Sequence, residues 1–380
     1  MYPPMYRLLT LMLGLLVCGL ATATVPTPSP PAVAGTAHLL LDMHSDRVLA
    51  ESNADDRLEP ASLTKIMSAY AVFKELQEGH LQLTDEVLVS EKAWRTEGSR
   101  SFIEVGKQVP VETLLKGMIV QSGNDASVAL AEHVAGSEET FAALMNGHAK
   151  RLGMRNTHFV NSTGLPDPDH YTTSRDIARV SEATIREFPE YYKWYSIKEY
   201  LYNGIKQHNR NKLLWRDDSV DGIKTGHTAS AGYCLVASAQ RGDMRLISVV
   251  MGTKSEESRA QETLSLLNYG FRFFETHKLY PARQGLAKVR VFKGQVNELQ
   301  LGLTKDLYVT IPRNQYENLS AKLVMEPTIV APAAAGMAYG FVKVQLGDQE
   351  VARAPLVALQ DVAEGGVLGN ALDSVLLWFQ

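Results

Sequence analysis

The order of apolar and polar positions divides the chain into segments of different character. Two short strand-like segments at 37–42 and 46–51 flank the polar turn at 43–45, which predicts a β-hairpin at the start of the folded part. After Pro60, apolar residues recur every third or fourth position as far as Glu78, which predicts an amphipathic helix. The same helical spacing continues downstream, in segments 114–120, 128–134, 141–152 and 176–188.

The pattern returns to strands after Asp221. Segments 233–239 and 245–251 flank the turn sequence Gln-Arg-Gly-Asp and predict a second hairpin, and a closing helix is expected over 255–275. Strands at both ends of a region, with helices between them, favour one α+β unit. We expect its terminal strands to share an antiparallel sheet that helices cover.

Beyond Pro281 the helical spacing disappears. Short alternating segments at 287–292, 306–311 and 341–346 predict a second, all-β domain. The last segment has one apolar helical face, which could lie on a membrane surface or dock on the second domain. Residues 364–380 contain no Lys or Arg, so only apolar burial would hold this helix on a membrane.

The first residues of the chain include Arg7, which is followed by an almost unbroken apolar run at 8–20 and by small residues at 21–23. This order is typical of a cleaved secretory signal peptide, and the run is too short to span a bilayer. The Pro-rich stretch that follows predicts an extended connector. We therefore expect a signal peptide at 1–23, a linker at 24–35, a first folded domain at 36–281, a β-rich domain at 282–363 and an amphipathic helix at 364–380.

Composition and charge exclude several classes of protein. A net charge of -4 without a dense Lys/Arg cluster gives no electrostatic footprint for nucleic acid. The 10 histidines show no ligand spacing of the H-E-x-x-H kind, so neither a metal nor another cofactor is expected. Of the 2 cysteines, Cys18 would leave with the signal peptide, so Cys234 has no partner for an intramolecular disulfide.

The start of the first predicted helix holds the strongest candidate for chemistry. Ser62 and Lys65 are three residues apart, so on a helix they face the same side. A lysine whose pKa is lowered by desolvation can take the proton of a serine, and backbone N–H groups at a helix start favour negative charge. Alone, this S-x-x-K sequence is weak evidence, because a capping serine and a surface lysine would explain it equally well.

Two further short motifs strengthen that candidate. Ser122, Gly123 and Asn124 form an S-x-N sequence between two helical segments, where a left-handed turn would be the structural explanation for Asn124. Lys224-Thr-Gly lies on the approach to the second hairpin and is typical of a strand edge. The order S-x-x-K, S-x-N, K-T-G matches that of penicillin-binding proteins and class A β-lactamases, whose middle motif is S-D-N.

Longer strings extend the match, at 60–65, 120–126, 209–211, 221–228 and 270–276. On these residues the chain resembles, over nearly its whole length, the low-molecular-mass penicillin-binding proteins of the D-alanyl-D-alanine carboxypeptidase 5/6 type, serine peptidases of the S11 kind. Gly123 in the middle motif is typical of that family. The resemblance implies a transpeptidase/β-lactamase-like α+β catalytic domain, a small all-β domain and a C-terminal amphipathic helix.

The resemblance also implies roles in catalysis. Ser62 would attack the carbonyl between the two D-alanines of a peptidoglycan pentapeptide, and Lys65 would take the serine proton. Ser122 and Lys224 would pass a proton to the departing D-alanine, with Asn124 completing the catalytic set. Water would then release the acyl-enzyme, and β-lactam antibiotics would act as covalent inhibitors.

The remaining implied residues bind the substrate. Backbone N–H groups of Ser62 and of His227, the residue after Gly226, would hold the oxyanion. Thr225 and Arg210 would grip the terminal carboxylate, which needs a cationic or donor-rich seat; a solvated loop arginine is the alternative for Arg210. The signal peptide and the tail helix would place the protein outside the cytoplasm, on the periplasmic side of the inner membrane, bound peripherally to its outer face.

Three other functions compete with this interpretation. A class A β-lactamase needs a glutamate that activates the deacylating water, and region 161–169 contains none. A D,D-endopeptidase that cuts cross-links has nearly the same chemistry, because the motifs set the reaction class and leave the leaving group open. A non-catalytic cell-wall or shape-maintaining protein is the alternative outside enzymes, and the presence of all three motifs argues against it.

Overall fold

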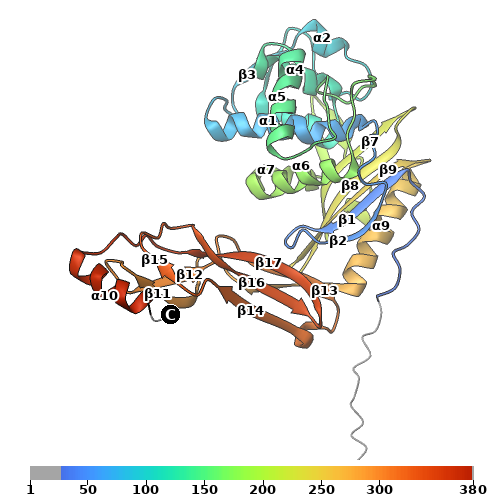
Figure 1. Ribbon diagram of the computed structural model, residues 1–380. Coiled ribbons are helices and arrows are strands. Elements are labelled where there is room, and N and C mark those ends of the chain that lie inside the picture. The colour runs from blue at the N-terminus through green and yellow to red at the C-terminus, as the bar shows by residue number, and fades with distance from the viewer. Residues whose placement is uncertain (1–26, 379–380) are drawn as a thin grey trace, which may run out of the picture.

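Strands from both ends of the first domain meet in one antiparallel sheet. The computed structural model describes residues 27–378, and the predicted signal peptide at 1–23 lies outside this part. The strands are β1 Ala37–Asp42, β2 Val48–Ser52, β7 Val220–Thr228, β8 Gly232–Arg241 and β9 Met244–Thr253. They pair in the order β2-β1-β9-β8-β7, which leaves β7 at an edge, and Figure 1 shows the blue N-terminal hairpin beside the yellow strands. The expected antiparallel sheet with helices on it is confirmed.

Side-chain alternation along these strands builds two cores. Because successive strand residues point to opposite faces, Leu39 joins one core and Leu40 joins the other. The core with Leu39 contains residues of α1 (Thr64–Glu78), α4 (Asn124–Ala135), α5 (Glu138–Arg151) and α6 (Ser174–Glu187). The core with Leu40 lies under α9 (Glu256–Phe273), which ends earlier than expected because β10 begins at Phe274.

The first long helix is more deeply buried than its sequence predicts. Every residue of α1 from Thr64 to Phe73 is buried, including Lys65 and Ser68. The prediction of an amphipathic helix is therefore wrong for this half of α1. Small side chains such as Ala69 and Ala71 let neighbouring helices pack on the faces that polar residues would otherwise present to solvent.

Short helices and strands connect the long elements of the first domain. The predicted segment 114–120 is interrupted, because α3 ends at Lys116 and a π-helical turn, η2 (Gly117–Gln121), replaces regular helix. The remaining elements of this domain are η1 Ala61–Leu63, β3 Glu86–Leu88, α2 Glu91–Arg95, β4 Gln108–Pro110, α3 Val111–Lys116, α7 Pro189–Tyr192, η3 Lys193–Ser196, β5 Glu199–Tyr202, β6 Ile205–His208 and α8 Leu213–Arg216.

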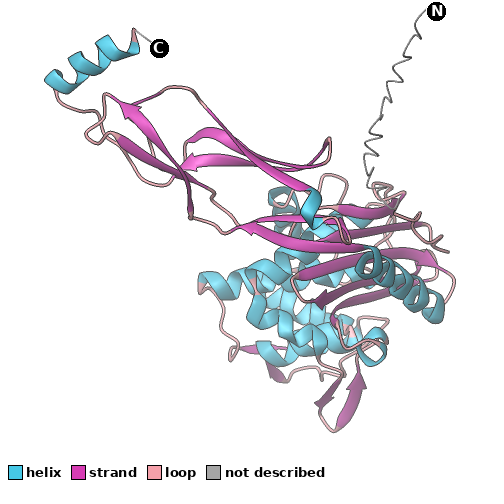
Figure 2. Cartoon of the chain, turned by 90° about the horizontal axis from the view of Figure 1, so that it is seen from below, coloured by secondary structure: helices cyan, strands magenta, loops and turns pink. Residues whose placement is uncertain are grey.

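The second domain is built of strands, and Figure 2 shows it extending away from the first. Its strands are β10 Phe274–Tyr280, β11 Gly285–Phe292, β12 Glu298–Gly302, β13 Leu307–Pro312, β14 Leu319–Met325, β15 Ile329–Val330, β16 Ala338–Leu346 and β17 Gln349–Ala358, with η4 at Tyr316–Asn318. β10 pairs with β13, and the others form a six-stranded sheet in the order β14-β16-β17-β12-β11-β15. A helix, α10 (Val367–Leu377), follows at the far end of the domain. The expected all-β domain and terminal helix are thus present.

Candidate active site

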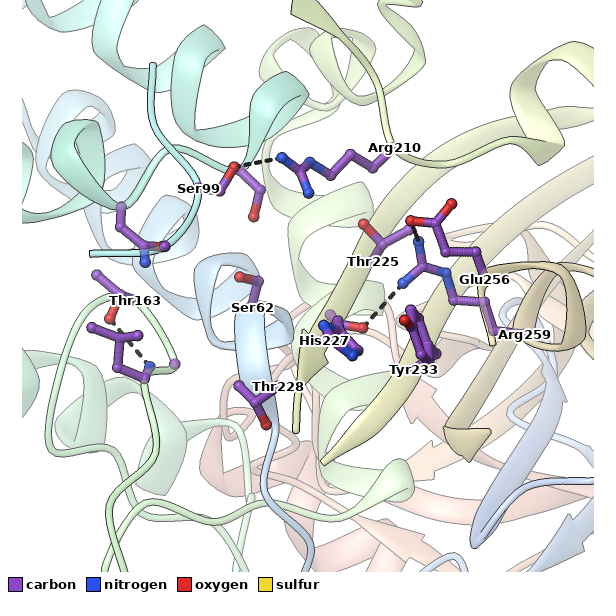
Figure 3. Close-up of a pocket in the computed structure, with 16 residues that line it drawn as sticks. Ser62, Ser99, Thr163, Arg210, Thr225, His227, Thr228, Tyr233, Glu256 and Arg259 are labelled. Carbon is purple, nitrogen blue, oxygen red and sulfur yellow. Dashed lines mark hydrogen bonds and ion pairs between the residues drawn. The ribbon is translucent and has the colours of Figure 1, made fainter. Parts of the chain in front are cut away.

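A pocket of about 290 Å³ lies between the helices and the edge strand β7. It brings together residues from distant parts of the sequence (Figure 3). Of the predicted site residues, it is lined by Ser62, Ser122, Asn124, Arg210, Thr225, Gly226 and His227. The two predicted lysines do not line it; Lys65 is 1% exposed and Lys224 is 3% exposed.

The turn that carries Ser62 has an unusual backbone. Ser62 lies in η1, and Ala61 directly before it has a φ of 47°, a left-handed conformation that costs energy for a residue with a side chain. Strand β7 packs against this turn, since a Cβ atom on Gly226 would lie 3.2 Å from Ala61 Cβ and 3.3 Å from Ser62 N. Glycine at 226 therefore allows β7 to approach the nucleophile's backbone closely.

Lys65 is held directly beneath the serine. Its Nζ lies 3.1 Å from Ser62 Oγ, 2.6 Å from Asn124 Oδ1 and 2.6 Å from the carbonyl oxygen of Thr163. Burial lowers the pKa of the Lys65 amine to about 7; Asp125 opposes this shift and Arg210 adds to it. A large fraction of the amine is therefore neutral near pH 7, and in that form it can accept the Ser62 proton.

The turn after η2 presents the second serine. Ser122 has a φ of 68° and a ψ of 33°, so the left-handed turn suggested for Asn124 falls on Ser122 instead. Its Oγ is buried and makes no hydrogen bond within the described residues. A strained serine with an unused hydroxyl at the wall of a pocket is available to a substrate group.

Asn124 begins α4 and links three parts of the site. Its Oδ1 accepts from Lys65 Nζ, its Nδ2 donates to the carbonyl of Glu97 at 2.5 Å, and its backbone N–H donates to the carbonyl of Ser99 at 2.7 Å. These bonds tie the loop at 97–99 to the lysine. Asn124 thus fixes both the position of the Lys65 amine and one wall of the pocket.

Lys224 lies on β7, buried near other basic side chains of the site. Its Nζ donates to the carbonyl of Thr225 at 3.0 Å. Burial lowers the pKa of the Lys224 amine well below its usual range, and the nearby cations Lys65 and Arg259 add to the shift. Burial disfavours charge on both amines, so the positive charge for an anionic substrate end comes from the guanidinium groups of Arg210 and Arg259, which line the pocket.

The structure adds Arg259, a residue that the sequence motifs did not reveal. It comes from α9, is 4% exposed and donates from Nη1 to the carbonyl of Gly226 at 3.2 Å. Figure 3 shows Arg210, Thr225 and Arg259 on the same side of Ser62. Arg210 Nη2 donates to Ser99 Oγ at 2.9 Å, so it too is placed at the pocket. The guanidinium groups of Arg210 and Arg259 and the hydroxyl of Thr225 together form a site that suits a carboxylate.

Within residues 27–378, one cluster offers three side chains that could bind a metal ion. It consists of Glu75, Glu78 and His80, near the end of α1, where His80 Nδ1 lies 3.0 Å from Glu75 Oε2. At about 1.5 Å per helical residue, Glu75 is roughly 15 Å along α1 from Lys65. This cluster is too distant to take part in chemistry at Ser62.

Comparison with known families gives two matches. Residues 24–255 match the family described as D-alanyl-D-alanine carboxypeptidase, and residues 274–364 match the C-terminal domain of penicillin-binding protein 5. D-alanyl-D-alanine carboxypeptidase DacC of Escherichia coli strain K12 is 45% identical over 367 residues, covering 94% of this chain and 92% of that protein. DacF of Bacillus subtilis strain 168 is 34% identical over 376 residues, covering 96% of each.

Solved structures agree with the sequence comparisons. Penicillin binding protein 5 from Haemophilus influenzae superposes with a TM-score of 0.85 at 41% identity, covering 89% of this chain and 100% of that chain. D-alanyl-D-alanine carboxypeptidase DacD from Francisella tularensis gives a TM-score of 0.74 at 33% identity, covering 89% and 95%. The similarity therefore includes both domains.

Proposed function

The chain belongs to the D-alanyl-D-alanine carboxypeptidase family of serine peptidases, and from this membership we propose how its own residues remove the terminal D-alanine of peptidoglycan pentapeptides. The observation that carries the assignment is the contact between Lys65 Nζ and Ser62 Oγ at 3.1 Å. We assign the reaction to the first domain, expected from the sequence at 36–281, and the role of a β-rich extension to the second, expected at 282–363, whose first strand β10 already begins at Phe274.

Acylation uses Ser62 as the nucleophile. Ser62 Oγ attacks the carbonyl carbon of the penultimate D-alanine while its proton moves to Lys65 Nζ. The backbone N–H groups of Ser62 and His227 stabilise the resulting oxyanion. As the C–N bond breaks, the proton moves from Lys65 to the departing nitrogen, and we assign Ser122 and Lys224 to that transfer. D-alanine leaves, and a peptidyl ester remains on Ser62.

Deacylation uses water in the same site. A water molecule attacks the ester carbonyl while one of its protons passes to the neutral Lys65 amine. The bond between the carbonyl carbon and Ser62 Oγ then breaks, the proton returns to Oγ, and the shortened peptide leaves with a new terminal carboxyl group. Among the pocket-lining residues the one carboxylate is Glu256, which lies 3.0 Å from Lys212 Nζ and 3.8 Å from Arg259 Nη2. It is engaged by cations and is therefore a poor base for the rapid deacylation that a β-lactamase needs.

The acylation rate is expected to depend on pH through Lys65. Only the neutral amine accepts the serine proton, and burial lowers the pKa of this amine to about 7. The rate should therefore fall by about tenfold per pH unit below pH 7 and level off above about pH 8. Measuring the second-order rate of acylation by a fluorescent penicillin from pH 5 to 9 tests this, and a rate constant that does not change between pH 5 and 8 would contradict it.

The proposed carboxylate-binding site predicts a preference for substrates with a free terminal carboxylate. Arg259→Gln removes a buried guanidinium group, so kcat/KM for a pentapeptide with a free terminal carboxylate should fall by about 10- to 100-fold. The same peptide with a terminal amide should lose much less, because it lacks the charge that Arg259 binds. Arg216→Gln is the matched control, since Arg216 pairs with Glu257 at the surface. Equal losses for both peptides would show that Arg259 does not bind the carboxylate.

We propose that the protein is exported and rests on the outer face of the cytoplasmic membrane through α10. Three apolar side chains near the end of the chain are turned outward: Val375 is 60% and Leu376 45% exposed in α10, and Trp378, directly after it, is 92% exposed. Asp373 holds the helix to the second domain by accepting from Arg290 Nη2 at 3.0 Å and from Lys293 N at 2.5 Å. Val375 and Trp378 lie on the side of the helix away from Asp373, so they can contact a membrane while Asp373 stays docked. Within the described residues, no helix has the length and apolar character to cross a bilayer.

Deleting residues 367–380 is expected to abolish binding to phospholipid vesicles. Because residues 364–380 contain no Lys or Arg, the full chain should remain bound when the salt concentration is raised to about 0.5 M. Co-sedimentation with vesicles measures both effects, with penicillin acylation as the control for folding. A truncated protein that still sediments with vesicles would refute the role of α10.

A further inference from the structure

A loop between α5 and α6 lies beneath the nucleophile and contains a buried histidine. His158 and Tyr171 pair across the base of this loop, and His170 next to that pair is 2% exposed. Both ring nitrogens of His170 are used. The backbone N–H of Val160 donates to Nδ1 at 3.1 Å, and Nε2 lies 2.8 Å from Thr64 Oγ1. Since Nδ1 accepts, Nε2 carries the hydrogen and donates it to Thr64.

The contact continues from Thr64 to the strained turn. Thr64 Oγ1 donates to the carbonyl oxygen of Ala61 at 2.9 Å, and Ala61 is the residue with a φ of 47° directly before Ser62. Two hydrogen bonds therefore connect the histidine to the turn: His170 Nε2–H donates to Thr64 Oγ1, and Thr64 Oγ1–H donates to Ala61 O. Each hydrogen takes part in one bond. The two bonds connect a buried ring to the peptide group that sets the direction of the nucleophile.

The same loop makes two other contacts at this point. Gly164 packs so closely on the turn that a Cβ atom there would lie 1.7 Å from Ala61 O. The neighbouring carbonyl of Thr163 accepts from Lys65 Nζ at 2.6 Å. The loop thus supports both members of the Ser62 and Lys65 pair, one through His170 and Thr64 and the other through its own backbone.

The ring of His170 stays neutral across the working pH range. Burial lowers its pKa to about 4; Asp167 and Glu138 oppose this shift, and His158 and Lys65 add to it. A neutral ring keeps one hydrogen, and the bond from Val160 fixes that hydrogen on Nε2. Phe159 packs edge-on against the ring with centroids 5.6 Å apart, which restricts its rotation.

We propose that His170 is a positioning residue for acylation, which acts through Thr64 to hold the Ala61 turn so that Ser62 Oγ faces Lys65 Nζ. This proposal rests on the assignment of Ser62 as the nucleophile. It assigns no proton transfer to His170. A residue that merely filled the core would affect stability, whereas His170 should affect the acylation rate of protein that is already folded.

Three single variants, the double variant of His170→Leu with Thr64→Val, and one control separate these roles. His170→Leu removes the donor, His170→Gln can place an amide N–H near the position of Nε2–H, and Thr64→Val removes the hydroxyl that links the two. His158→Leu is the matched control, because this partly exposed ring in the same loop lies 2.7 Å from the backbone carbonyl of Asp169 and against the ring of Tyr171, away from the Thr64 contact. For each protein we would measure the acylation rate by a fluorescent penicillin, the melting temperature, and the labelled residue.

The expected results form a defined pattern. His170→Leu should acylate about 10- to 100-fold more slowly than the native chain at a temperature where both are folded, because small displacements of reacting groups are costly. Thr64→Val should be slowed to a similar degree, and the double variant no further. His170→Gln should recover to within about threefold of the native rate, and His158→Leu should match it within about twofold.

Two results would overturn the proposal. One is native acylation by folded His170→Leu or Thr64→Val, even with a lowered melting temperature, which would leave His170 a purely structural role. The other is a failure of His170→Gln to acylate faster than His170→Leu; if His170→Leu does not fold, Thr64→Val and His170→Gln decide the matter. Label on a residue other than Ser62 in the native chain would instead refute the assignment of the nucleophile.

Discussion

The Ser62→Ala variant is expected to release D-alanine from a pentapeptide at least about 10⁴-fold more slowly than the native chain, because no other group replaces the attacking oxygen. Ser62 Oγ contacts Lys65 Nζ and sits in a pocket, so its loss should leave the fold intact. Alanine also fits the helical turn that Ser62 occupies. The variant should therefore still bind the substrate while failing to form the ester.

The measurement is D-alanine release by purified protein, with thermal unfolding as a check on the fold. Ser230→Ala is the matched control, because Ser230 is an exposed serine that contacts Glu59 outside the catalytic set. Its release rate should stay within about twofold of the native rate. Release by Ser62→Ala at more than about 1% of the native rate would rule out Ser62 as the nucleophile.

The second large effect concerns the base. Lys65→Met keeps the length of the side chain but removes the amine, so kcat should fall by about 10²- to 10⁴-fold, the usual contribution of a positioned general base. The loss should be in the chemical step, with little change in KM, because Lys65 is buried beneath Ser62 and does not line the pocket.

Stability should distinguish this loss from misfolding. The pKa of the Lys65 amine is lowered to about 7 by burial, so between that pH and its unfolded value near 10.5 the unfolded chain binds more protons than the folded one. In this range the buried amine reduces stability, and stability rises with pH. Methionine removes that cost while leaving two acceptors, Asn124 Oδ1 and Thr163 O, unpaired. We expect opposing effects and a melting temperature at pH 7.5 within a few degrees of the native one.

Lys193→Met is the matched control for this variant, since Lys193 is a surface lysine paired with Glu190. It should retain native D-alanine release. Activity of Lys65→Met within tenfold of native, in protein with a native melting curve, would show that another group takes the serine proton.

The sequence could locate much of the candidate site because the residues proposed for catalysis lie in short, contiguous strings. Ser62 and Lys65 are one helical turn apart, and Lys224, Thr225 and Gly226 follow each other along one strand. Local spacing predicts their relative placement once the element is known. The terminal strands of the first domain are short apolar runs on either side of polar turns, and this hairpin pattern predicted the sheet.

Features that depend on distant contacts could not be predicted in this way. The burial of α1 from Thr64 to Phe73 results from helices that pack on several of its sides, and one segment's periodicity does not reveal its neighbours. The left-handed conformation of Ser122 falls on a residue with a side chain, whereas sequence patterns place such turns at glycine or asparagine.

Two contacts in the candidate site could not be predicted from any pattern in the sequence. Arg259 lies in a helix start rich in charged residues, where it is typical of a solvated surface, yet it is 4% exposed beside Gly226. Thr163 contributes its backbone carbonyl to Lys65, a group that every residue possesses. Only the three-dimensional arrangement distinguishes these residues from their neighbours.

Formation of an acyl-enzyme on Ser62 is the step on which the proposed reaction depends. Incubating the full chain briefly with a labelled penicillin, digesting it and locating the label by mass spectrometry tests this step directly. We expect label on Ser62 alone, formed when its Oγ attacks the β-lactam carbonyl, the ring C–N bond breaks and the nitrogen takes the serine proton, and no label in Ser62→Ala. Label on any other residue, or an unlabelled native chain, would contradict it.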